Sequence, residues 1–317
     1  MWFDSFRAVY GNSNLQLDGF AENVINYILG MHEILKGNFN LKSKNIDLNE
    51  FAVYASSAPA APAGTSASGV IMIPANLDLA FKADAEKVLY NDVVLSHFTG
   101  GLNINPAGIQ VTETNFEMIG CQVTMDGKYA PISMLRASFN YHLVAKDFDV
   151  QRAYKEIKLF HDLASSAAHA SGIISLDYTL SGKLNEKMYP IYPSLVGSGV
   201  LSVKKVKFNG WKLFNAVSSQ SQKTELKDPD LSKIDLKSSI KNNLITIQKL
   251  KFKTGGMRIR FEGQTSFDNR VNFKMRIGLP PLGIIGIPIR VTGTSDIPKI
   301  KMSSSENDPL QEKEDLP

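Results

Sequence analysis

Histidines and cysteine are the residues of this chain best suited to bind a metal or act as a nucleophile. His161 and His169 share a predicted helix, but eight positions separate them, so they cannot chelate one ion as an i, i+4 pair would. A single cysteine, Cys121, excludes an intramolecular disulfide and a multi-cysteine metal site. We therefore predict no metal and no other cofactor. The remaining histidines are scattered at His32, His97 and His142.

Motifs for covalent or phosphate chemistry are missing from the sequence. It contains no His-Glu-x-x-His, no Gly-x-Ser-x-Gly and no Walker loop. Its glycine pairs, such as Gly100-Gly101 and Gly255-Gly256, do not open a helix after a strand, so they favour hairpin turns or bulges. Asp147 and Asp149 could perform acid–base work, but a helix cap is the simpler interpretation. We expect the protein not to be an enzyme.

Charge and hydropathy exclude two further classes of function. The net charge is +4 over 317 residues, and basic residues alternate with acidic and apolar ones, which argues against nucleic-acid binding. The basic strand Val203–Phe208 favours a solvated face over a site for anionic headgroups. The sequence contains no apolar run of about 18 residues, which is the length that would predict a membrane-spanning helix. The first residues lack a signal peptide, and we expect a piece cut from a longer chain.

Alternation of apolar and polar residues dominates the chain and predicts its fold class. Met257, Ile259 and Phe261 alternate with charged residues, and the same pattern returns from Val271 to Ile277. This period of two is typical of antiparallel strands with one face buried and one charged face in water. We expect a mainly β protein built of long, curled, antiparallel sheets, as a groove, a sandwich or an open barrel, with two or three short helices.

Three segments show helical spacing instead. Apolar residues from Phe20 to Leu35 predict a first helix with Asp18 as its cap. Asp149 is the expected cap of a second helix that ends near Gly172. Residues 211–217 predict a short third helix, and 218–230 a mobile loop. Between the strands we expect turns at residues 100–101, 105–108 and 126–127, with 116–125 as one alternating run.

Composition divides the chain into four parts. Residues 1–54 are predicted to be an N-terminal helix and strand segment of the β domain. Residues 55–69 are rich in Ala, Pro, Ser and Gly and predict a flexible loop. Residues 70–302 form the predicted β-rich body, and 303–317 an acidic, disordered tail.

The apolar face of the strands is the candidate site. Few helices are available to cover many strands, so this face must pack on itself or remain open as a groove for a ligand or lipid. Each alternating apolar residue is more often core than lipid contact. The candidate lining residues are Phe116, Met118, Phe139, Tyr141, Met257, Ile259, Phe261, Val271, Phe273, Met275 and Ile277.

Several segments, taken in order, resemble the C-terminal region of the AsmA family of bacterial envelope proteins, which is related to the TamB- and YhdP-type β-groove lipid transporters. The resemblance spans most of the chain from Gly37 to Met302 and rests on glycines and alternation. The segments that carry it are Gly37–Ala55, Lys87–Tyr129, Phe148–Leu184, Gly197–Val217 and Gly256–Pro280.

The resemblance implies a periplasmic body that is anchored in the inner membrane by an N-terminal helix missing here. It implies a curled β-sheet with an apolar lumen that helps to move phospholipid toward the outer membrane, and no catalytic residues. We therefore expect a lipid-handling β groove whose partner is a phospholipid or another acyl-chain lipid. The alternative is a structural envelope domain that binds protein partners, for instance by strand addition at an exposed edge.

Overall fold

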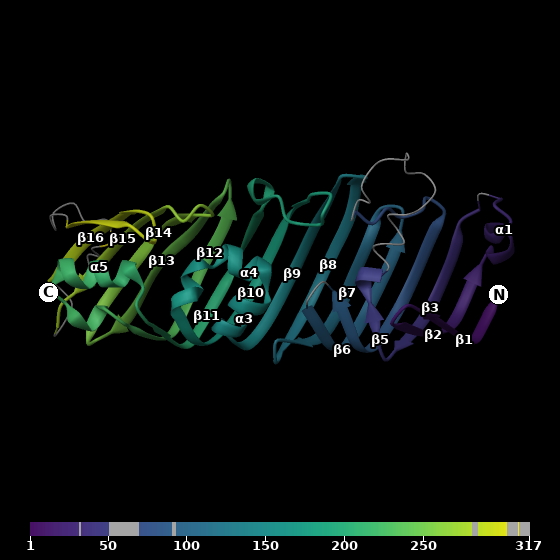
Figure 1. The fold of residues 1–317 in the computed structure, drawn as a ribbon, viewed down its shortest axis with the longest axis horizontal. Helices are drawn as coiled ribbons and strands as arrows, with labels where there is room; N and C mark the ends of the chain where they lie inside the picture. The colour runs from purple at the N-terminus through teal and green to yellow at the C-terminus, as the bar shows by residue number, and fades with distance from the viewer. Residues whose placement is uncertain (32, 51–69, 91–92, 281–284, 303–309, 311–317) are drawn as a thin grey trace. The chain divides into compact units, whose positions relative to one another are not determined.

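The computed structural model describes residues 1–31, 33–50, 70–90, 93–280, 285–302 and 310. The predicted fold class is confirmed, because 65% of the structure is strand and 15% is helix. The strands belong to one open sheet of 17 strands, shown in Figure 1. The predicted flexible loop, 55–69, lies outside the described residues. So does the predicted acidic tail, except for Leu310.

The chain divides into two compact units that differ from the four predicted parts. Unit 1 comprises Met1–Ala145 and Thr179–Leu195, and unit 2 comprises Lys146–Tyr178 and Val196–Pro317. The body predicted over 70–302 therefore contains parts of both units. The N-terminal segment belongs to unit 1.

Unit 1 is built from strands that pair in chain order. The pairs are antiparallel, except that β5 runs parallel to β3 and to β4. A short 3-10 helix, η2 (Tyr192–Ser194), also belongs to it. The strands are β1 (Trp2–Tyr10), β2 (Ser13–Glu22), β3 (Leu35–Ser43), β4 (Ile46–Asp47), β5 (Leu77–Tyr90), β6 (Val93–Asn105), β7 (Gly108–Met118), β8 (Cys121–Ser133) and β9 (Arg136–Asp149), the last with its final residues in unit 2.

The first predicted helix is mostly wrong. The structure has only α1 (Val24–Ile28), because Phe20 lies in β2 and pairs with Asn38 of β3. The ring of Phe20 packs on Trp2 at a centroid distance of 5.1 Å, and this tertiary contact outweighs the helical spacing. Asp18 is a strand residue and caps no helix.

Two predicted turns are also wrong. Gly127 lies inside β8 opposite Val111, and the Asp126 carboxylate accepts the Glu113 backbone N–H at 2.7 Å, which holds a bulge rather than a turn. Gly100 and Gly101 lie inside β6. The run 116–125 is interrupted by a hairpin between β7 and β8, where Met118 pairs with Cys121. The turn at 105–108 is confirmed.

Unit 2 begins with helices and continues as an antiparallel meander. The helices are α3 (Val150–Glu156), α4 (Lys158–Leu163), η1 (Ser165–His169), α5 (Lys212–Ser221) and η3 (Thr224–Leu226). Strands β11 to β17 pair in chain order. Its strands are β10 (Ala170–Leu184, through Tyr178 in this unit), β11 (Val196–Phe208), β12 (Asp230–Lys241), β13 (Leu244–Thr254), β14 (Met257–Ser266), β15 (Val271–Gly278), β16 (Gly286–Gly293) and β17 (Pro298–Met302).

The second predicted helix begins where expected but is divided. Asp149 caps α3 by accepting the Arg152 backbone N–H at 2.8 Å. Ile157 then adopts an extended conformation and separates α3 from α4. His161 and His169 consequently lie on different elements, α4 and η1, and not on one helix.

The third predicted helix is confirmed as α5, which covers part of the apolar face of unit 2 (Figure 1). Its Leu213, Phe214 and Val217 are buried against β14, β15 and β16. The predicted loop 218–230 is partly wrong, because α5 continues to Ser221 and Leu226 is buried in the same core. None of the helices that the structure describes is both long and apolar enough to cross a membrane.

Candidate functional site

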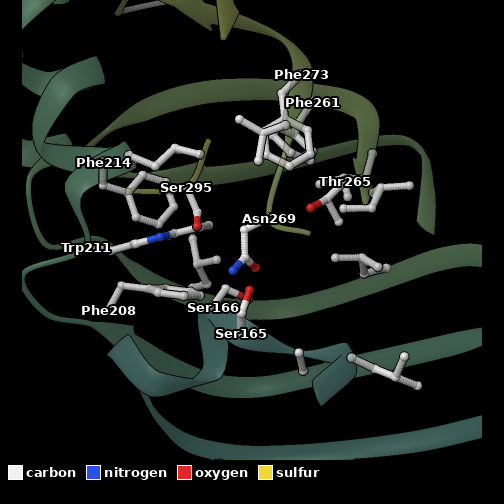
Figure 2. Close-up of a pocket in the computed structure, with 18 of the residues that line it drawn as sticks. Ser165, Ser166, Phe208, Trp211, Phe214, Phe261, Thr265, Asn269, Phe273 and Ser295 are labelled. Carbon is white, nitrogen blue, oxygen red and sulfur yellow. The ribbon is translucent and has the colours of Figure 1, made fainter. Parts of the chain in front are cut away.

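Unit 2 contains an apolar cavity of about 180 Å³ on the face that α5 partly covers. Strands β12 to β15 form the floor of the cavity (Figure 2). The end of β11 and the start of α5 form one side, and residues 162–166 form another. The lining includes five aromatic residues and one amide: Phe208, Trp211, Phe214, Phe261, Phe273 and Asn269.

A cluster of three aromatic rings forms one wall of the cavity, visible at the left of Figure 2. Phe208 and Trp211 stack with centroids 5.4 Å apart and planes inclined by 22°. Phe214 meets Trp211 edge to face at 5.0 Å. Offset and edge-to-face pairs are the favoured aromatic geometries, so each ring holds the next in a fixed orientation. The wall is apolar and pre-formed.

A second aromatic pair comes from the neighbouring strands β14 and β15. The rings of Phe261 and Phe273 lie 4.9 Å apart. Phe273 pairs across the strands with Gly263, whose φ of +151° and crowded Cβ position exclude a larger residue. The Phe273 ring therefore covers the backbone of Gly263, which fixes the wall on this side of the cavity.

The rim of the cavity is polar but mostly uncharged. Ser165, Ser166, Thr265, Asn269 and Ser295 border it in Figure 2. The backbone N–H of Ser295 donates to the Asn269 carbonyl at 3.0 Å, which ties two of the loops together. Hydroxyl and amide groups of this kind can hydrogen-bond an uncharged or zwitterionic ligand without imposing a net charge.

One ionisable side chain, Asp162, is among the lining residues. Its carboxylate binds the Lys158 ammonium at 2.8 Å and contacts His161 Nδ1 at 3.1 Å. Nearby Asp268 is exposed, and hydrogen bonds from Ser266 and then Arg270 lower its pKa. Both carboxylates are thus paired with basic side chains, Asp162 with Lys158 and Asp268 with Arg270, whose Nε lies 2.8 Å from the Asp268 carboxylate.

The predicted groove residues of unit 2 fall into two groups. Phe261, Val271, Phe273 and Met275 line the cavity. The other three are packed in the core to which α5 contributes, and they do not line the cavity. They are Met257, Ile259 and Ile277. Among the predicted residues, Val271, Phe273 and Met275 belong both to the core and to the cavity lining.

The four predicted groove residues of unit 1 lie on β7 and β9. Phe116 is 3% exposed and stacks on Phe98 at 6.1 Å, so it is a core residue. Met118 is half-buried at the end of its hairpin. Phe139 and Tyr141 are half-buried and stack on each other at 5.8 Å.

The apolar face of unit 1 carries a row of half-buried aromatic rings. Phe39 stacks on Phe81 at 5.7 Å and contacts Phe3 at 6.0 Å. Between Phe3 and Phe39 lies Gly19, which pairs with both and leaves room for their rings to meet. This face therefore keeps partly accessible apolar surface within unit 1.

Sequence reasoning missed the cavity residues that lie outside the regularly alternating strands. Phe208, Trp211 and Phe214 come from the end of β11 and the start of α5. Their spacing of three residues, with a break in strand period at Asn209, is the sequence signal that marks a chain reversal. No pattern in the sequence marks Ser165 and Ser166 as cavity residues, because their position at the cavity depends on the break in the helix at Ile157.

The other candidate groups are not among the residues that line this cavity. Cys121 is buried and its Sγ lies 3.2 Å from the Met118 carbonyl. Lys204 of the basic strand forms an exposed ion pair with Asp147, and that hydrogen bond is the main reason why the Asp147 pKa is lowered. Within the part of the chain that the structure describes, no group of three His, Cys, Asp or Glu residues could hold a metal ion.

Comparison with protein-family models, with curated proteins and with solved structures finds no match to this chain.

Proposed function

We propose that this protein is a non-enzymatic β protein that handles lipid, and that the cavity of unit 2 receives part of an acyl chain. The observation that carries the proposal is an apolar cavity of about 180 Å³ with aromatic walls and a polar rim in which Asp162 is the one ionisable residue. An engineered apolar cavity of about 150 Å³ stays dry and binds benzene, so this one has room for a ring or several methylene groups. Each methylene buried there contributes about 0.8 kcal/mol.

The wider role is proposed from the resemblance to the AsmA family. In that role the protein is a periplasmic domain, anchored in the inner membrane in its full-length form, that contributes to phospholipid transport or to outer-membrane assembly and homeostasis. The half-buried aromatic row of unit 1 supports this proposal, since partly accessible apolar surface on long strands is a feature that an acyl chain can follow.

The chain offers its own reporter for the test. It contains two tryptophans, of which Trp211 lines the cavity and Trp2 is 77% exposed on β1. In a Trp2→Phe variant the tryptophan fluorescence therefore comes from Trp211 alone. We expect phosphatidylcholine with brominated acyl chains to quench Trp211 in a saturable manner. The matched control is Trp211→Phe, in which we expect the same lipid to quench Trp2 only in proportion to its concentration.

Mass spectrometry of the purified chain gives an independent result. We expect phospholipid to be retained by the native chain and reduced in Leu236→Asp, which places a charge among the lining residues. Near- and far-ultraviolet circular dichroism would show whether Leu236→Asp keeps the native fold. No retained lipid together with no saturable quenching of Trp211 would reject the proposed function.

A second candidate function is a structural envelope domain that binds a protein partner by strand addition. The observation in its favour is β1, where Trp2, Phe6 and Val9 are 77%, 48% and 79% exposed. Exposed apolar residues on such a strand favour pairing with another strand. Val9→Lys would weaken a partner complex captured by crosslinking in cells and leave Trp211 quenching unchanged.

A further inference from the structure

Unit 1 has a hollow of about 700 Å³ on the polar face of its strands. This volume falls within the range of about 300–1,000 Å³ that is typical of sites for small molecules. Five neighbouring strands, β2, β3, β5, β6 and β7, contribute residues to it. At the usual strand spacing of about 4.8 Å the hollow therefore extends over about 19 Å, which is longer than a single sugar or amino acid. We call it the polar hollow.

Strand pairing places the side chains of the polar hollow in two neighbouring rows. Directly paired residues point to the same face of a sheet, and so do residues two apart on one strand. In the first row Lys82 of β5 lies between Asn40 of β3 and Gly101 of β6. The first row is Asp18, Asn40, Lys82, Gly101 and Thr112, and the second is Lys42, Asp84 and Thr99.

Gly101 gives the polar hollow its floor, because it is the residue of the two rows that has no side chain. A Cβ at this position would lie 2.6 Å from Thr112 Oγ1, so the Thr112 hydroxyl stands over the space beside the glycine. Lys82 is paired with Gly101 on the other side. The floor is therefore bare backbone between an ammonium group and a hydroxyl group.

The charged side chains around this floor are available to a ligand. Lys42 is directly paired with Asp84, and both are exposed, as is Lys82. In the part of the chain that the structure describes, none of these three side chains forms an ion pair or a hydrogen bond. The two ammonium groups can donate hydrogen bonds and the carboxylate can accept them. The polar hollow thus offers donors and acceptors side by side.

The balance of charge favours an uncharged ligand. The carboxylates of Asp18, Asp84 and Glu113 stand against the ammonium groups of Lys42 and Lys82, so a polyanion would be repelled as well as attracted. An acyl chain would desolvate these groups without giving them partners, which is costly. Hydroxyl groups both donate and accept, so a ligand dense in hydroxyls satisfies the ammonium groups and the carboxylates together. Sugars have this chemistry.

An exposed tryptophan lies on the same face, beside the end of the polar hollow that Asp18 lines. Trp2 is 77% exposed and packs on Phe20, the residue with which it is paired. Phe20 and Asp18 are two residues apart on β2, so they share a face at a distance of about 7 Å. A flat aromatic ring can cover the C–H groups of a sugar ring while the hydroxyls bond polar side chains.

We propose that the polar hollow binds an uncharged, β-linked oligosaccharide of glucose or N-acetylglucosamine. The substituents of these sugars are equatorial, so each face of the ring presents C–H groups that fit the flat ring of Trp2. Lys42 and Lys82 donate to hydroxyls of the sugars that lie over Gly101, and Asp84 accepts from them. This inference stands on residues of unit 1 and does not depend on the proposed acyl-chain site in unit 2.

Trp2 itself is the reporter for the test. In a Trp211→Phe variant the tryptophan fluorescence comes from Trp2 alone. We expect cellohexaose or chitohexaose to shift this emission to shorter wavelengths along a saturable curve, because a stacked sugar removes water from the exposed ring. Isothermal titration calorimetry of the native chain with the same two sugars should give the same dissociation constant.

Two substitutions separate recognition in the polar hollow from a contact with Trp2 alone. Lys82→Met removes the ammonium group and should weaken binding about tenfold, since a hydrogen bond from a charged group is lost. Gly101→Val fills the floor and should abolish the saturable shift, and circular dichroism would show whether the fold is kept. The matched control is Lys128→Met, at an exposed lysine of β8 outside the hollow, which should bind as the native chain does.

The inference is wrong if neither cellohexaose nor chitohexaose gives a saturable signal in either assay. It is also wrong if Lys82→Met and a folded Gly101→Val bind these sugars as tightly as Lys128→Met does. Tighter binding of hexagalacturonate, or of a neutral serine–glycine hexapeptide, than of both sugars would show that the hollow recognises an anion or a peptide instead. Quenching of Trp211 by brominated lipid is a separate measurement and can succeed or fail independently.

Discussion

Phe273→Ala tests whether the apolar face of unit 2 is packed core or open groove. Phe273 is 4% exposed, so nearly all of its ring is removed from water. Truncation of a buried phenylalanine in a packed core costs about 3–5 kcal/mol, from lost burial and from the cavity that remains. Phe261 is only half-buried, and we expect Phe261→Ala to cost about 1–3 kcal/mol.

The two rings also allow a double-mutant cycle. Their centroids lie 4.9 Å apart, and an aromatic pair at that distance contributes about 0.5–1.5 kcal/mol beyond its buried area. The double variant should therefore lose less stability than the sum of the two single variants, by about that amount.

The assay is urea unfolding followed by Trp211 fluorescence in the Trp2→Phe background, so that the signal reports unit 2. The slope of the unfolding free energy against urea concentration should stay constant, while the midpoint falls. Phe139→Ala, at a half-buried ring of unit 1, is the control and should leave the Trp211 transition in place. A loss below about 1 kcal/mol for Phe273→Ala would refute the reasoning, because such a small cost means that the ring is not packed.

Three smaller perturbations test local parts of the structure. Asp149→Ala removes the cap of α3 and should lower the free energy of unfolding by about 0.5–2 kcal/mol, measured by urea titration, whereas Asp149→Asn should restore most of it. The Tyr129 hydroxyl hydrogen-bonds the backbone of Ile71, and burial raises the pKa of this phenol. The stability that the neutral phenol contributes is therefore present below pH 10 and lost as the pH rises beyond it. Thermal melts of Tyr129→Phe should show a smaller loss of stability at alkaline pH. Gly263→Ala forces a Cβ to within 2.4 Å of a backbone carbonyl and should destabilise the chain more than Gly256→Ala, which has positive φ but open space around it, as differential scanning calorimetry would show.

The strands of unit 2 could be predicted because their alternation is uninterrupted. From Met257 to Phe261 and from Val271 to Ile277, each apolar position faces the core and each polar position faces away. The hairpin between Met118 and Cys121 was missed for a related reason. Met118 and Cys121 lie directly opposite each other across a two-residue turn, so the apolar residues on both sides of the turn share one face. The remaining signal was the spacing of three between Met118 and Cys121, where an unbroken strand would have two.

The cavity could not be predicted from alternation, because alternation shows which face is apolar but not what covers it. The aromatic wall depends on the chain reversing after Phe208, so that Trp211 and Phe214 approach the sheet from α5. The rim depends on Ile157, whose extended backbone divides a helix that the sequence pattern shows as continuous. Both features are tertiary, and neither is visible in the period of the strands themselves.

The same limit applies to the charged side of β14 and β15, where the sequence pattern was right about the side and wrong about the environment. Alternation correctly placed Arg260 and Arg276 opposite the core, and charged residues on that side are normally solvated. Arg260 and Arg276 are nevertheless only 5% and 1% exposed. Alternation assigns a residue to one face of a sheet, but its burial depends on which residues stand beside it on the neighbouring strands. The Arg276 guanidinium has its space because position 286, on the adjoining strand β16, is a glycine, and a Cβ there would lie 2.7 Å from Arg276 Nε.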